Sequence, residues 1–162
     1  MIKPQMPLVE ALFEYINRDI TRYHMPGHKG GQGFSQEFLD HLAQMDVTEI
    51  SGLDNLHYPQ GAIHNAQKLA SEAFGSHHTW FLVNGSTAGV HAMILAACPP
   101  GSSLIVPRNC HKSVLNAMVM GDIHPIYIQP EYHVDRELIT QVSLKVVEKA
   151  FEDNPDAKGM LL

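Results

Sequence analysis

From residue 79 onward, short apolar stretches alternate with amphipathic stretches, and this alternation constrains the fold more than any other feature of the sequence. β-branched and aromatic residues favour strands, whereas apolar residues at a spacing of three and four favour helices. Strands are predicted at residues 79–83, 103–106 and 123–128 and from residue 159, and helices at 86–97, 111–120 and 139–150. Such an alternation with short connections predicts an α/β fold with a mostly parallel sheet covered by helices on both faces.

The preceding residues show a different pattern, in which helices are separated by loops. Apolar spacing predicts a helix over residues 8–18, a second one capped by Ser35 and ending near Met45, and a third over 63–73, stopped by Gly75. Proline and three glycines rule out a regular element at 24–31, and 46–58 reads as extended or looped. We therefore divide the chain into residues 1–60, which hold helix and loop segments, and residues 61–162, the first half of an α/β domain.

The last residues, 159–162, read as the beginning of a strand that has no continuation. A complete domain seldom ends in an apolar stub, because such a stub leaves a sheet edge uncovered. We therefore expect the α/β domain to be truncated.

Composition narrows the function classes. The formal net charge of -6 does not attract nucleic acid, so no nucleic-acid partner is expected. Two cysteines, Cys98 and Cys110, do not form a disulfide framework, so a reducing, cytoplasmic location is expected. The segment Met1–Gln5 contains no apolar h-region, so no signal peptide is expected, and the longest apolar run, residues 92–98, is too short to span a membrane.

The segment Asn84–Gly89 is the first candidate site, because it follows a predicted strand and opens a predicted helix. Backbone amides and the hydroxyls of Ser86 and Thr87 at a helix N-terminus suit a phosphate group. Gly85 allows a sharp turn and a close approach of the ligand to the backbone. The alternative is a capped helix after a turn, without a ligand. Neither a G-x-G-x-x-G pattern nor a P-loop is present.

The segment Arg108–Ser113 follows the next predicted strand, so it lies at the same carboxyl edge of the sheet as Asn84. A histidine at this place can stack on a planar heteroaromatic ring or bind a carboxylate. The alternative is a polar helix start, with Asn109 as the cap and His111 in solvent. Lys112 reads as a surface residue rather than a covalent cofactor lysine, because nothing nearby would desolvate it.

The histidines suggest a metal site, but their spacing does not support one. His24 and His28 are four residues apart, as metal ligands on a helix are, yet Pro26 and Gly27 between them prevent a helix. We therefore expect no metal.

Taken together, these segments resemble the Orn/Lys/Arg decarboxylase family, the group I decarboxylases that depend on pyridoxal 5′-phosphate (PLP) and have the aminotransferase-like fold. The likeness covers about residues 7–131, and the segments stand in the family's order. The matching segments are His24–Gly30, Asp46–Glu49, Leu53–His57, Phe81–Gly89 and Val106–Ser113.

The resemblance implies a fold-type I large domain and a role for each matching residue. The PLP phosphate would be held by Gly85, Ser86, Thr87 and Ala88, and the pyridine ring would be covered by His111, with Ser113 as a weaker candidate for a contact. Residues near the active site or a dimer interface would be His24, His28, Asp54 and His57. The family also implies a homodimer or higher oligomer, whose segments can serve the partner subunit's site.

Two family motifs are missing from the chain. The family's aspartate that pairs with the pyridine nitrogen, and its Ser-x-His-Lys lysine that holds PLP covalently, have no counterpart in residues 1–162. The resemblance therefore implies a carbon–carbon lyase that decarboxylates arginine, lysine or ornithine to a polyamine-type product. This chain would carry only the phosphate-binding and ring-stacking part. The alternative is a non-catalytic remnant that binds PLP or phosphate weakly or not at all.

Overall fold

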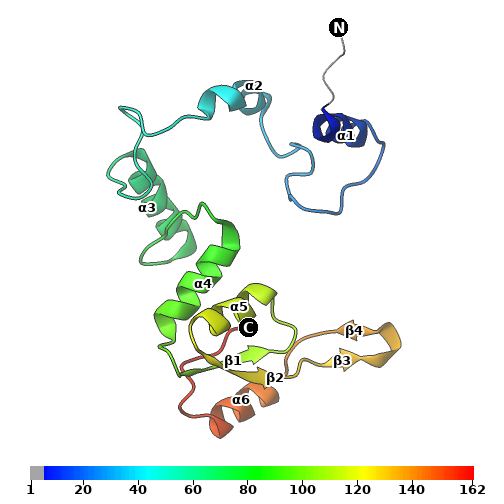
Figure 1. Ribbon diagram of the computed structural model, residues 1–162, viewed down its shortest axis with the longest axis vertical. Helices are drawn as coiled ribbons and strands as arrows, with labels where there is room; N and C mark the ends of the chain where they lie inside the picture. The colour runs from blue at the N-terminus through cyan, green and yellow to red at the C-terminus, as the bar shows by residue number, and fades with distance from the viewer. Residues whose placement is uncertain (1–5) are drawn as a thin grey trace. The chain divides into compact units, whose positions relative to one another are not determined.

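The computed structural model describes residues 6–162 (Figure 1). The chain divides into two compact units, which we describe separately. The first unit ends at His64, and the second comprises Asn65–Leu162.

The first unit consists of two short helices and long loops. Helix α1 (Pro7–Ile16) begins with a proline, which is favourable there because the first helical amide needs no partner. Helix α2 (Gln36–Met45) begins where predicted, and the Ser35 hydroxyl accepts a hydrogen bond from the Phe38 amide at 3.2 Å. No residue between 6 and 64 is buried. The described part of this unit therefore has no hydrophobic core of its own.

Helix α3 (Ala62–Phe74) crosses the boundary between the units and ends at Gly75, as predicted. Gly75 has φ +67°, a backbone conformation in which glycine commonly ends helices. The strand predicted at residues 79–83 is wrong, because this segment pairs with no other described strand. A strand requires neighbours for its amides and carbonyls, and without them Trp80 and Val83 remain about 70% exposed.

The sheet of the second unit is parallel. Strand β1 (Ser103–Pro107) pairs in parallel with β2 (His124–Ile128), with Ile105 opposite Ile126. On the other edge of β1, Ile105 forms a parallel bridge with Met160. The Ile105 amide donates to the Gly159 carbonyl, and the Leu161 amide donates to the Ile105 carbonyl, both at 3.0 Å. The predicted last strand is thus present as a short extension, and β1 lies in the middle.

Side chains of β1 alternate between two hydrophobic clusters on the two faces of the sheet. Leu104 and Val106 pack with residues of α4 (Gly85–Ala97) and α5 (Lys112–Met120). Ile105 packs with Ile128 and with Ala150 of α6 (Leu144–Asp153). Burial on both faces explains why β1 is a continuous apolar run. The expected α/β architecture with a parallel sheet is confirmed.

A small hairpin replaces the beginning of the predicted last helix. Strands β3 (Tyr132–His133) and β4 (Leu138–Ile139) pair antiparallel around a short 3₁₀ helix, η1 (Val134–Arg136). The helix predicted from Ile139 therefore starts only at Leu144. Ile139 matches the helical period, but it pairs with Tyr132 in the hairpin instead of starting a helix. Ile139 is 56% exposed.

Candidate functional site

The turn before α4 presents backbone amides to solvent. Gly85 has φ +71°, and Asn84 precedes the helix without capping it through its side chain. Ser86 and Thr87 are exposed, and Ala88 is half-buried. The first amides of a helix have no partner within it, so these positions offer hydrogen-bond donors and a partial positive charge. The donor set fits a phosphate group.

His111 caps helix α5 with its own side chain. Its Nδ1 accepts a hydrogen bond from the Ser113 amide at 3.2 Å and lies 2.8 Å from the Ser113 hydroxyl. The alternative cap predicted for this helix, Asn109, is therefore wrong. His111 is exposed, whereas Ser113 is 3% exposed. The imidazole is thus fixed at one nitrogen and accessible elsewhere.

Helices α4 and α5 contact each other, and buried residues of both share a hydrophobic cluster with Leu104 and Val106 of β1. Helix α4 leads into the amino end of β1 through residues 98–102, and α5 leaves its carboxyl end through residues 108–111. Helix α5 therefore begins at the carboxyl end of β1, where α/β folds bind ligands. No hydrogen bond between described residues joins His111 to the hydroxyl of Ser86 or Thr87, and the described bonds of the His111 ring are those to Ser113.

In the first unit, His24 and His28 each bond to nearby groups. The His24 Nδ1 lies 2.6 Å from the Met25 carbonyl oxygen, and its Nε2 bonds the hydroxyl of Tyr15. The His28 Nδ1 accepts from the Gly31 amide at 3.0 Å. Both rings are exposed and shape the loop between α1 and α2.

Asp54 organises the loop before α3. Its carboxylate accepts hydrogen bonds from five backbone amides at 2.7–3.1 Å. These hydrogen bonds hold the pKa of Asp54 well below its usual range, because they stabilise the charged carboxylate. The bond from the Gln60 amide has the largest effect, followed by those from Gly61 and His64. The donors belong to Asn55, Gln60, Gly61, Ile63 and His64. The neighbouring His57 is exposed, and its amide donates to the Asn55 side chain at 2.8 Å.

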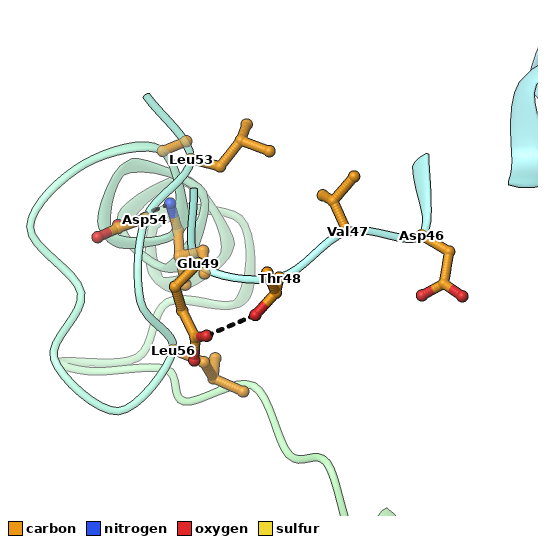
Figure 2. A pocket seen from close by; sticks show the side chains of 9 residues that line it. Asp46, Val47, Thr48, Glu49, Leu53, Asp54 and Leu56 are labelled. Carbon is orange, nitrogen blue, oxygen red and sulfur yellow. Dashed lines mark hydrogen bonds between the residues drawn. The ribbon is translucent and has the colours of Figure 1, made fainter. Parts of the chain in front are cut away.

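A pocket of about 650 Å³ lies beside this loop (Figure 2). The Thr48 hydroxyl donates to the Glu49 carboxylate at 2.8 Å, and this bond lowers the pKa of Glu49. These residues were not predicted as site residues, although the Asp46–Glu49 motif was the signal that could have found them. The pocket is lined by Asp46, Val47, Thr48, Glu49, Leu53, Asp54, Leu56, Ala62 and Ile63.

Two absences hold for residues 6–162. Among these residues, no group of three or more His, Cys, Asp or Glu side chains lies close enough together to hold a metal ion. Within the same range, every helix is too short or too polar to cross a membrane.

Comparison with known proteins identifies the family. A family model described as "Orn/Lys/Arg decarboxylase, major domain" matches residues 6–162. The chain therefore belongs to the Orn/Lys/Arg decarboxylase family.

Individual relatives agree with this assignment. The uncharacterised protein YaaO of Bacillus subtilis is 43% identical over 159 residues, covering 96% of this chain and 33% of that protein. An arginine decarboxylase of Bacillus cereus is 39% identical over 166 residues, covering 100% of this chain and 36% of that protein. The chain thus spans about a third of the length of these curated relatives.

Among solved structures, the constitutive lysine decarboxylase of Escherichia coli superposes with a TM-score of 0.59 and 23% identity. The superposition covers 93% of this chain and 23% of that one. At this identity, the likeness shows a shared fold.

Proposed function

We propose that this chain forms the phosphate-binding and ring-stacking part of a PLP-dependent decarboxylase that acts on arginine, lysine or ornithine. The observation that carries the proposal is the placement of two matched motifs. The turn at Gly85 opens α4 and the cap at His111 opens α5, and these two helices contact each other. Membership in a decarboxylase family supports the reaction class, and the α/β sheet supports a fold-type I large domain.

The residues at the start of α4 would bind the phosphate. The amides of Thr87 and Ala88 would donate to its oxygens, as would the hydroxyls of Ser86 and Thr87. Gly85, at φ +71°, allows the sharp backbone turn that precedes these donors. Hydrogen bonds to a charged group are worth about 1.5–3 kcal/mol each, so this set could anchor the cofactor without a covalent bond.

His111 would cover the pyridine ring with its imidazole and orient it. When bound, PLP withdraws electrons from the bond to the departing carboxylate. The residues of this chain would position the cofactor for that step. The aspartate and the covalent lysine that the family uses have no counterpart motif in residues 1–162.

The first unit would contribute to an oligomer and to the surroundings of the site. Its described residues bury nothing, and α1 leaves Leu8, Leu12 and Phe13 more than half exposed. Apolar surface of this kind marks a site of association, which supports a homodimer or higher oligomer. In such an oligomer, His24, His28, Asp54 and His57 would lie near the active site. Asp54 would act there by shaping its loop, because backbone amides surround its carboxylate.

The phosphate assignment can be tested with pyridoxine 5′-phosphate, which carries the ring and the phosphate but no aldehyde for lysines. Trp80 is the chain's single tryptophan and lies four positions before Asn84 in the sequence, so quenching of its fluorescence gives the dissociation constant. Replacing Ser86 and Thr87 together by alanine should weaken binding by at least about 100-fold, because two hydroxyl bonds to a charged group are lost and each costs about 1.5–3 kcal/mol.

Ser143→Ala is a matched control, because Ser143 also opens a helix and makes no capping bond through its side chain. This control should bind as the original chain does. Unchanged affinity in the Ser86/Thr87 variant would remove the phosphate assignment. Failure of the original chain to bind would favour the non-catalytic alternative.

A further inference from the structure

Two donors from Ser113 converge on a single nitrogen of His111. The Ser113 amide lies 3.2 Å and the Ser113 hydroxyl 2.8 Å from Nδ1. Ser113 is almost completely buried, whereas the imidazole is exposed. A buried hydroxyl thus holds an exposed ring.

These contacts determine the tautomer of the ring. A backbone amide can only donate, so Nδ1 must accept, and it therefore carries no proton. A neutral imidazole has one proton, which must then lie on Nε2. With Nδ1 unprotonated, the Ser113 hydroxyl also acts as a donor. His111 thus presents an N–H at Nε2 and a neutral aromatic face.

We propose that Ser113 is a positioning residue that fixes the tautomer and the ring orientation of His111. This inference rests on the proposed ring-stacking role of His111. The amide alone would suffice to cap α5. The hydroxyl adds a second donor at the same nitrogen, so the ring cannot turn over about its own axis without losing two hydrogen bonds.

The tautomer can be measured without any cofactor. Long-range ¹H–¹⁵N NMR spectra of the full chain distinguish Nδ1 from Nε2 protonation, and His111→Gln assigns the signals. In the original chain, the neutral ring should be protonated at Nε2. Ser113→Ala should shift the tautomer ratio toward Nδ1 protonation by about 2- to 13-fold, the value of one neutral hydrogen bond. Ser113→Thr, which retains the hydroxyl, should restore the original ratio.

Ser102→Ala serves as the control, because Ser102 also has a buried hydroxyl, lies before the amino end of β1, and makes no bond to His111. It should leave the His111 signals unchanged. A neutral ring protonated at Nδ1 in the original chain would overturn the inference, even if every variant failed to fold. A tautomer ratio that Ser113→Ala leaves unchanged would overturn it as well.

Ligand titration separates this inference from the proposed function. Ser113→Ala should weaken binding of pyridoxine 5′-phosphate but not of inorganic phosphate, because only the former has a ring. The Ser86/Thr87 variant should weaken binding of both. If the tautomer result holds and the original chain binds neither ligand, the proposed function fails while the positioning of His111 stands. If both ligands bind and the tautomer does not respond, the reverse is true.

Discussion

Replacing Gly85 by alanine tests the turn on which the phosphate site depends. Gly85 has φ +71°, and a Cβ at this position would meet no other atom within 4 Å. The substitution therefore introduces no clash, and its cost comes from the left-handed backbone alone. That cost is about 1–2 kcal/mol for a residue with a side chain.

Gly101 provides a matched control within the same unit. Its φ is +76°, a Cβ there would also meet nothing within 4 Å, and it lies before the amino end of β1. Gly101→Ala should therefore lower the free energy of unfolding by the same ~1–2 kcal/mol, measured by urea titration. The two variants should differ only in their effect on the ligand site.

The difference should appear in the affinity for pyridoxine 5′-phosphate. If the turn at Gly85 relaxes, the amides of Thr87 and Ala88 move. The loss of one hydrogen bond to the phosphate then weakens binding by roughly 10- to 160-fold. Gly101→Ala should bind as the original chain does. Equal weakening by both variants would refute a specific role for the turn. An alanine at Gly85 that costs no stability would refute the left-handed conformation itself.

Three further predictions concern the fold, the first unit and the thiols. Ile105→Ala should cost about 2–5 kcal/mol in urea unfolding, because the side chain is 0% exposed, whereas Val119→Ala, at 83% exposed, should change stability by less than about 0.5 kcal/mol. The Asp54 loop should be stable above the ordinary aspartate pKa of about 3.9 and lose order only as pH falls further, since the folded-state pKa is depressed. The Gly61 amide resonance should therefore hold its position down to that pH, and a shift at higher pH would contradict the network. Burial raises the pKa of the Cys110 thiol, so its alkylation by iodoacetamide should be slower at pH 8 than that of a free cysteine and should accelerate at higher pH, whereas an equal rate would count against burial.

Signals confined to a few neighbouring residues were predictable from the sequence. The Ser35 cap and the Gly75 stop each depend on contacts within one helical turn, and both are present as predicted. Strand β1 was equally clear, because burial on both faces demands a continuous apolar run. Each of these features is determined by residues within the element or one helical turn of it, so the local sequence is sufficient to predict it.

Features that depend on distant partners were not predictable. Residues 79–83 have the composition of a strand, but pairing decides whether a strand forms, and composition does not show a neighbour. Ile139 fits a helical period, yet it lies in a hairpin strand and pairs with Tyr132. The adjacent bond from the Thr140 amide to the Glu131 carbonyl belongs to the same hairpin. The period alone could not reveal that competition.

The candidate site shows the same division. Gly85 and its helix start could be located from the order of residues alone. The cap made by His111 could not, because it depends on which ring nitrogen accepts the hydrogen bond from the Ser113 amide. The five amides around Asp54 span a whole loop, and that closure is visible only in three dimensions.

The middle position of β1 has a consequence for the order of events during synthesis. Its second neighbour comes from residues 158–161, far along the chain from Ser103 and Ile105. A ribosome makes β1 long before that neighbour, so the nascent strand emerges with one edge open. Such an edge recruits foreign strands, and the interval before residues 158–161 arrive is the period in which a chaperone would most improve the yield of folded protein.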